Sequence, residues 1–281
     1  MTEPTAGSRE TGTYPVVQRA SIRFFRRVAR YWTGLFRDIG LRTYFVRDIG
    51  RAFGDPATYV PETLRQMKTI GVDSVILTVI VAAFIGGVIA LLTRYQLLPG
   101  VQLSIIGLAS RLMIIPELGP LLTGLVLTGR VGARMTAEIG TMRVTEQIDA
   151  LETLAYDPVA FLVVPRLLAA TIMLPTLVVL ADAVGLYSAY VVSTYVTNVP
   201  AHDFIEGLRL GFGTFQVVYS LLKAVMFGIA IALVCSYEGY ITEAGAEGVG
   251  RSTARAVVIA SVTILVLDGL TAAVLGPLLQ T

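Results

Sequence analysis

The chain has 281 residues, of which 54% are hydrophobic and 15% are charged, with a net charge of +2 and a mean hydropathy of +0.72. Soluble globular domains carry nearer a quarter charged residues, so this composition excludes an ordinary soluble domain and is typical of a polytopic membrane protein. Cys235 is the only cysteine and His202 the only histidine, which excludes a disulfide framework, a thiolate metal site and a multi-histidine cluster. We therefore predict no metal site.

The N-terminal region divides into two parts by composition. Residues 1–15 are polar and rich in Thr, Gly and Pro, which predicts a disordered tail. Residues 16–58 are basic and aromatic, with arginines on the faces that the apolar side chains leave free. The apolar positions recur at three- and four-residue spacing: Val17, Phe24, Val28, Trp32, Leu35 and Ile39. This pattern predicts a basic amphipathic helix that lies in the headgroup region of a membrane.

Five apolar runs follow, each long enough to cross a bilayer, which takes about 20 helical residues. The predicted fold is all-α, with transmembrane helices at about Ile70–Leu92, Leu103–Thr128, Val159–Val196, Phe215–Tyr237 and Thr253–Leu275. The third run could also form a hairpin of two spans. More than half of the Lys and Arg residues precede Ile70, so the positive-inside rule places the N-terminus in the cytoplasm. If the third run is one long span, Arg134 and Arg255 lie on the cytoplasmic side as well. The same rule therefore favours five spans. A short amphipathic helix is predicted on the outer face near Phe204–Leu210.

One long polar segment interrupts the apolar runs, from Gly129 to Pro158 (GRVGARMTAEIGTMRVTEQIDALETLAYDP). Its Ala, Met, Glu, Gln and Leu residues favour helix. Gly140 is the weak point of this helix-forming segment and predicts two short helices rather than one long one. A charged helix between spans two and three must lie in water, where it either contacts a partner or is simply a solvated loop helix.

Four ionisable residues fall inside the predicted spans: Glu117, Asp182, Lys223 and Asp268. A charge at the bilayer centre costs at least about 2.5 kcal/mol on insertion scales, so such residues face protein or a water-filled cavity. One cation among three anions predicts that Lys223 pairs with Glu117 or Asp268. The pair either fixes helix packing or lines a substrate cavity, and the residues alone leave both open. Pro116, beside Glu117, removes a backbone hydrogen bond and can open the helix locally.

The segment Glu117–Arg166 (ELGPLLTGLVLTGRVGARMTAEIGTMRVTEQIDALETLAYDPVAFLVVPR) resembles the signature of the MlaE-type (YrbE) permeases, the membrane subunits of ABC transporters in the Mla and Mce lipid-transport systems. The resemblance covers roughly residues 60–277 and assigns a permease domain to 60–281. It continues through LLKAVMFGI (Leu221–Ile229), GVGRSTARAVV (Gly248–Val258) and LDGLTAAVLG (Leu267–Gly276). The family usually has Arg before this glutamate, where this chain has Pro116. Arg111 lies on another part of the helix and cannot simply substitute for it.

The resemblance implies a homodimeric permease of the inner membrane that moves phospholipid or a similar lipid to or from a periplasmic MCE-domain carrier. The chain contains no phosphate-binding loop of the form G-x-x-x-x-G-K-[ST], so we expect a separate ABC ATPase subunit to bind and hydrolyse ATP with Mg²⁺. We expect no cofactor in this chain, no enzyme activity and no nucleic-acid partner.

The resemblance also assigns roles to residues. Glu117, Lys223 and Asp268 would lie near a lipid cavity at the dimer interface, and Asp182 is a fourth candidate for its lining. The polar segment would be a coupling helix seated in the ATPase. Its candidate residues are Gly132, Arg134, Glu138, Gly140, Arg143, Glu146 and Gln147.

Two other classes of function remain as alternatives. A gradient-driven secondary transporter would use Glu117, Asp182, Lys223 and Asp268 as a proton relay and would need no ATPase. A purely structural membrane anchor for partner proteins would need neither a proton relay nor an ATPase. The residues do not fix the lipid or the direction of transport.

Overall fold

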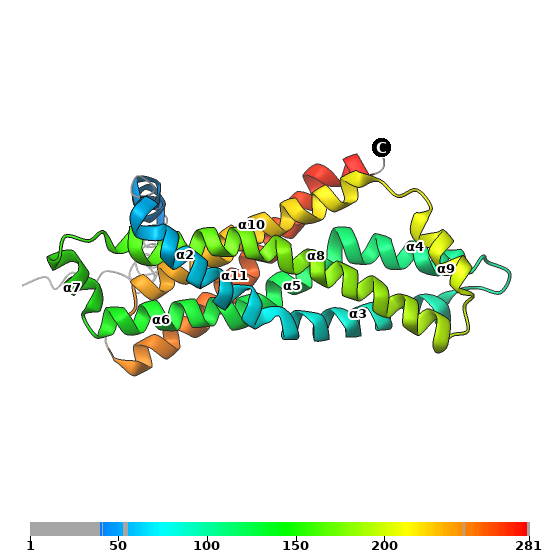
Figure 1. Cartoon of the computed structure of the whole chain (residues 1–281), viewed down its shortest axis with the longest axis horizontal. Helices are drawn as coiled ribbons and strands as arrows, with labels where there is room; N and C mark the ends of the chain where they lie inside the picture. The colour runs from blue at the N-terminus through cyan, green and yellow to red at the C-terminus, as the bar shows by residue number, and fades with distance from the viewer. Residues whose placement is uncertain (1–39, 41, 53–55, 244, 280–281) are drawn as a thin grey trace, which may run out of the picture. The chain divides into compact units, whose positions relative to one another are not determined.

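The computed structural model describes residues 40, 42–52, 56–243 and 245–279 (Figure 1). The chain forms two units, 1–47 and 48–281. Of the first unit, residues 40 and 42–47 are described, and they are helical. The predicted tail over 1–15 and most of the predicted interfacial helix over 16–58 lie outside the described residues.

The described part of the second unit is helical and contains five helical stretches long and apolar enough to cross a membrane. These stretches are Tyr59–Gln96, Ser104–Val144, Val159–Tyr195, Thr214–Tyr240 and Ala246–Leu278. The five predicted spans are therefore confirmed, although the helices extend beyond the apolar runs. The second stretch has 41 residues, about 60 Å of helix against a hydrocarbon core of about 30 Å.

Several of these stretches are built from more than one helical segment. The first contains α2 (Pro56–Ile70), η1 (Val72–Ser74) and α3 (Val75–Gln96), and the second contains α4 (Ser104–Met113), η2 (Ile114–Leu118), α5 (Gly119–Leu127), η3 (Thr128–Gly132) and α6 (Ala133–Val144). The third contains η4 (Val159–Val163) and α8 (Val164–Tyr195), and the last two are α10 (Thr214–Tyr240) and α11 (Ala246–Leu275) followed by η5 (Gly276–Leu279). The short helices α7 (Gln147–Thr153) and α9 (Ala201–Arg209) join spans.

Helix α8 is the central element of the bundle, since α2, α3 and α10 all pack against it. It is a single helix of 32 residues with Pro175 inside, so the alternative of a hairpin is wrong. Its approach to α3 is set by two glycines. A Cβ on Gly86 would lie 1.9 Å from the carbonyl oxygen of Gly185, so the two backbones touch where side chains are absent, as in close packing of membrane helices.

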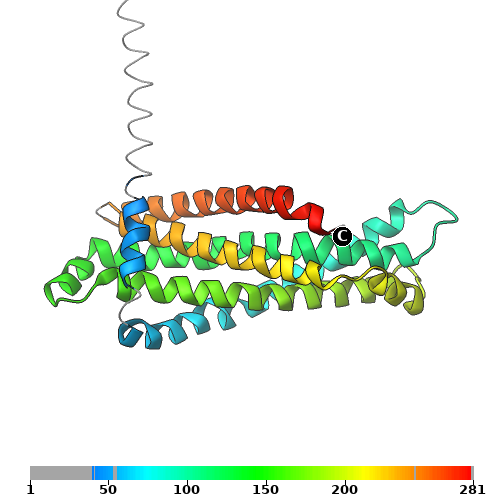
Figure 2. The same ribbon diagram turned by 90° about the horizontal axis from the view of Figure 1, so that it is seen from above.

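Helix α10 forms the second half of the core, with α6 and α11 packed beside it (Figure 2). Phe227, Ile231 and Cys235 on its inner face have no exposed surface. The hydroxyl of Thr136 on α6 donates a hydrogen bond to the Cys235 carbonyl over 2.9 Å. Cys235 is therefore a buried thiol that packs between helices.

Helix α9 lies at the opposite end of the bundle from α7 (Figure 1). It packs on α4 through reciprocal glycines: a Cβ on Gly107 would lie 2.1 Å from the Phe204 carbonyl oxygen, and one on Gly207 would lie 1.8 Å from the Ser104 carbonyl oxygen. Phe204 is fully buried. The helix predicted near Phe204–Leu210 therefore exists, a few residues earlier in the chain.

The polar segment after span two differs from the prediction in two respects. Helix α6 continues directly from the second span instead of forming a separate helix, and it runs through Gly140 without a break. The chain turns at Glu146, which has a φ of 59°. Gly140 lies against the chain just after α10, where a Cβ would come within 2.8 Å of the Thr242 hydroxyl oxygen. The glycine therefore serves close packing, which outweighs its low helix propensity.

Candidate functional site

The candidate site centres on Lys223 of α10, whose side chain has no exposed surface although it carries a charge. Its ammonium donates a hydrogen bond to Oε2 of Glu117 over 2.7 Å and forms an ion pair with Oδ1 of Asp268, also at 2.7 Å. The Tyr219 ring lies 4.9 Å from the ammonium. The predicted pairing of Lys223 is confirmed, and it involves both carboxylates. Spans two, four and five are thereby joined at one point.

The backbone around Glu117 is shaped to meet this lysine. The turn η2 is π-helical and contains Pro116, which has no amide hydrogen to donate. Such π-turns widen the hydrogen-bond ladder and are frequent at functional sites. Here the Pro116 carbonyl oxygen accepts a long hydrogen bond of 3.4 Å from Lys223. The local opening predicted beside Glu117 is therefore present, and the lysine uses it.

The three charges differ in how far they are enclosed. The Asp268 side chain is 11% exposed, whereas that of Glu117 is 42% exposed. Lys223 is nine residues from the start of α10, which places it about 14 Å into that helix from the end nearer α9. An exposed carboxylate at this depth of a membrane span is costly unless water or protein faces it.

Asp182 of α8 is near this cluster but has different partners. Its Oδ2 accepts a 3.3 Å hydrogen bond from the Ser220 hydroxyl, one turn before Lys223 on α10. Its Oδ1 is buried without a hydrogen-bond partner among the described residues and lies where a side chain on Gly119 would be. Asp182 therefore lies beside the site. It contacts Ser220, one turn before Lys223, and lies against Gly119, two residues after Glu117.

Arg111 is buried and bonds to the chain that follows α9. It donates to the carbonyl oxygen of Leu210 over 2.8 Å and to that of Gly211 over 3.3 Å. Its guanidinium carbon lies 5.6 Å from the centre of the Phe212 ring. Arg111 thus fixes the α9–α10 connection, in agreement with the expectation that it does not take the place of the missing family arginine.

At the other end of the bundle, the predicted coupling residues fall into three groups. Gly132, at the end of η3, and Gly140, in α6, are packing positions, and a Cβ on Gly132 would lie 2.8 Å from the Cys235 sulfur. Arg134 and Glu138 belong to an ion network. Arg143, Glu146 and Gln147 lie at the corner between α6 and α7.

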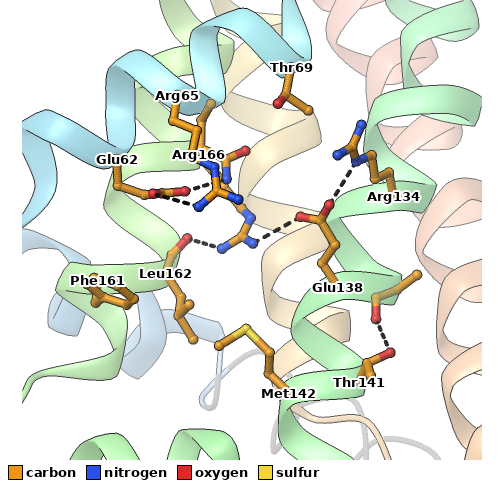
Figure 3. A pocket seen from close by; sticks show the side chains of 12 residues that line it. Glu62, Arg65, Thr69, Arg134, Glu138, Thr141, Met142, Phe161, Leu162 and Arg166 are labelled. Carbon is orange, nitrogen blue, oxygen red and sulfur yellow. Dashed lines mark hydrogen bonds and ion pairs between the residues drawn. The ribbon is translucent and has the colours of Figure 1, made fainter.

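Glu138 links α6 to the start of the third span. It accepts hydrogen bonds from Arg134 on its own helix at 2.8 Å and from Arg166 on α8 at 3.1 Å (Figure 3). The Arg166 side chain is only 6% exposed, and it also donates to the Leu162 carbonyl oxygen over 2.7 Å. Glu138 therefore holds a buried arginine, and its own side chain is 37% exposed.

The α6–α7 corner also carries exposed residues. Arg143 donates a 2.6 Å hydrogen bond to Asp149 across the turn, and both Glu146 and Gln147 are exposed. Two large apolar side chains follow α7, with Leu154 68% and Tyr156 54% exposed. Apolar side chains exposed beside charged ones are common where a partner binds.

A pocket at this end of the bundle was not predicted from the sequence. It has a volume of about 550 Å³ and is lined by α2, α6 and the beginning of the third span (Figure 3). The available signal was Arg166 in an otherwise apolar run, together with the polar face of α2 formed by Glu62, Arg65 and Gln66.

Known proteins resemble the chain over most of its length, and the family described as Permease MlaE matches residues 63–274. A probable ABC transporter permease protein of Rickettsia typhi is 38% identical over 216 residues, which is 75% of this chain and 82% of that protein. A probable ABC transporter permease protein of Synechocystis is 38% identical over 205 residues, covering 73% of this chain and 78% of that protein. The intermembrane phospholipid transport system permease protein MlaE of Haemophilus influenzae is 29% identical over 257 residues, which is 90% of this chain and 98% of that protein. The chain thus has the five apolar helices of a multi-pass membrane protein and belongs to the MlaE family of ABC transporter permeases.

Proposed function

We propose that this permease moves phospholipid, or a similar lipid with acyl chains, between the inner membrane and a periplasmic carrier. The observation that carries the proposal is the Lys223 cluster, a charged group inside the spans with one carboxylate, Glu117, left 42% exposed. A polar group at that depth needs a polar cavity or a protein partner. The relative in Haemophilus influenzae is named for intermembrane phospholipid transport, which supports lipid as the cargo.

The cavity is proposed to lie between two copies of the chain. A second copy facing Glu117 would enclose the carboxylate in protein and water, while apolar side chains of both copies accept the acyl chains. Glu117, Lys223 and Asp268 would then line the cavity, with Asp182 beside them. The ion pairs hold three spans together, so they define the cavity wall as well as its charge.

Energy would come from a separate ABC ATPase that binds ATP and Mg²⁺. The α6–α7 corner, with Arg143, Glu146 and Gln147, is its proposed contact, and the exposed Leu154 and Tyr156 would add apolar surface to it. Because α6 is continuous with span two, a displacement of the corner would be carried along one continuous helical stretch toward Glu117. Glu138 acts within this path by holding α6 to span three.

The proposed orientation places the N-terminus and α7 in the cytoplasm, and α9 on the periplasmic side. Helix α9 would then lie where an MCE-domain carrier receives or delivers the lipid. The Lys and Arg distribution supports this orientation through the positive-inside rule.

The test is native mass spectrometry of the tagged protein released with its neighbours from its own membrane. The proposal predicts two copies of the chain with two ATPase subunits, an MCE-domain protein and bound phospholipid. A chain or dimer that repeatedly lacks an ATPase would contradict it and favour a gradient-driven transporter or a structural anchor.

A further inference from the structure

The pocket between α2, α6 and the start of span three is a second polar site, at the end of the bundle away from the Lys223 cluster. Its lining charges are the guanidinium groups of Arg65, Arg134 and Arg166 and the carboxylates of Glu62 and Glu138. One positive charge is therefore in excess. A volume of about 550 Å³ lies within the range of small-ligand sites.

The three arginines differ in how much of their hydrogen-bonding capacity the protein uses. Arg166 is buried, and its Nε has no hydrogen-bond partner among the described residues. Arg134 is shared between Glu138 at 2.8 Å and, on its outer side, Asp73 at 4.0 Å. The Arg65 side chain is 80% exposed, and its ion pair with Glu62 is long, with 3.7 Å between the nitrogen and the carboxylate oxygen. Since a guanidinium offers five N–H donors, Arg65 provides most of the donors free to meet an anion.

The uncharged part of the wall combines polar side chains (Gln66, Thr69 and Thr141) with an apolar side formed by Ala137, Met142, Phe161 and Leu162. The pocket also lies at the boundary between polar and apolar chain. Four of its residues come from α2, which directly precedes the apolar α3, and Phe161 and Leu162 begin the apolar run of span three. This boundary corresponds to the headgroup level of a membrane, where one side of a site is wet and the other meets acyl chains.

We infer that this pocket binds the phosphodiester headgroup of an anionic membrane phospholipid from the leaflet at the α7 end. Arg65 contacts the phosphate at the open side, Arg134 and Arg166 supply positive potential from behind, and the apolar wall meets the glycerol and the upper acyl chain. Arginine suits this role because its planar fork pairs with phosphate oxygens. The lipid would occupy this site whether it is cargo or a bound regulator.

Binding is tested with the full chain in nanodiscs of phosphatidylcholine containing increasing fractions of phosphatidylglycerol brominated on its acyl chains. Trp32 is the only tryptophan, so Trp32→Phe combined with Phe161→Trp gives one reporter in the pocket wall, which the bromine atoms quench. The inference predicts that Arg65→Gln raises the half-quenching lipid fraction roughly fivefold through loss of charged hydrogen bonds. Glu62→Gln should lower that fraction, since it removes a competing carboxylate.

The matched control is Arg251→Gln, since Arg251 is also exposed and pairs with Glu247 one turn away, at 2.9 Å, but lies outside the pocket. It removes the same charge and should leave quenching unchanged. Equal effects of Arg65→Gln and Arg251→Gln, or no effect of either, would overturn the inference. Relief of quenching by glycerol 3-phosphate would also overturn it, because the pocket would then take a soluble anion.

Two features keep this test decisive. If the Phe161→Trp protein does not fold, Thr141→Trp places the reporter at an exposed residue of the same wall. The measurement contains no ATPase and no transport step, so its result is independent of the proposed transport function. Loss of transport with retained headgroup binding would count against the proposed function alone.

Discussion

The Lys223 ammonium and the Asp268 carboxylate oxygen Oδ1 are 2.7 Å apart, although they come from different spans and Lys223 has no exposed surface. This pair joins spans four and five at the depth where Glu117 of span two completes the group. Removing one partner of a buried ion pair leaves a buried charge without compensation. Neutralising every partner removes the desolvation penalty of the charges together with their Coulombic attraction. The cluster therefore determines which helices pack together more than it adds to the net free energy of unfolding.

The first prediction concerns Lys223→Met. It leaves Glu117 and Asp268 facing one another without a cation, and we expect a loss of about 3–5 kcal/mol of stability. Thermal unfolding in detergent measures it. The neutral triple variant Lys223→Met/Glu117→Gln/Asp268→Asn should unfold close to the native temperature. A single variant as stable as the triple variant would show that the charges do not form a coupled group.

The second prediction concerns the contact of α3 with α8. A Cβ at position 86 would lie 1.9 Å from the Gly185 carbonyl oxygen, so Gly86→Ala forces two backbones apart and should destabilise the protein by about 1–3 kcal/mol. The control is Gly269→Ala in α11, where nothing lies within 4 Å of the added Cβ. It should stabilise the helix by up to about 1 kcal/mol. Similar unfolding temperatures for the two variants would argue against the close approach.

The third prediction separates two glutamates of the polar segment. Glu138→Lys places a cation against the buried Arg166 and should cost about 2 kcal/mol or more in stability. Glu146 is exposed, so Glu146→Lys should change the free energy of unfolding by no more than about 0.5 kcal/mol. In the complex with the ATPase, it should lower the rate of ATP hydrolysis that is coupled to lipid transport. Unfolding temperature and ATPase rate are measured on both. Unchanged coupling in a folded Glu146→Lys protein would remove the corner from the proposed ATPase contact.

The fourth prediction uses Cys235 as a natural reporter of the α6–α10 contact. Its thiol is fully buried against Gly132, so maleimide labelling of the resting protein should be at least about a hundredfold slower than after denaturation. If α6 moves during ATP turnover, labelling in the complex should accelerate with ATP. Rapid labelling of the resting protein would contradict the packing of α6 on α10.

The sequence predicted the spans well because a run of about 20 apolar residues has few structural outcomes in a membrane. It also predicted the partners of Lys223, since one cation among intramembrane anions has few ways to be neutralised. The continuity of α6 with span two was not predicted, because the charges of this segment occupy one face of a helix whose other face is buried. Met135 and Ile139 form a buried stripe on α6, while Arg134 and Glu138 lie on the neighbouring face, about 100° around the helix.

The pocket could not be predicted for a different reason. Arg166 and Glu138 are 28 positions apart in the chain and meet only because α6 packs beside the start of span three. Likewise Gly140 was interpreted by its intrinsic propensity, whereas its role depends on Thr242 of a distant segment. Propensity scales describe one helix at a time, and these positions are defined by the contact between two.

The central claim is that the Lys223 cluster lines a lipid path driven by a separate ATPase. The most direct measurement is transfer of a fluorescent phospholipid by the purified complex in proteoliposomes, comparing the native chain with the neutral triple variant. The account predicts transfer that requires ATP hydrolysis and is lost in the triple variant while the complex stays assembled. Transfer driven by a pH gradient without an ATPase, or undiminished transfer by the folded triple variant, would contradict it.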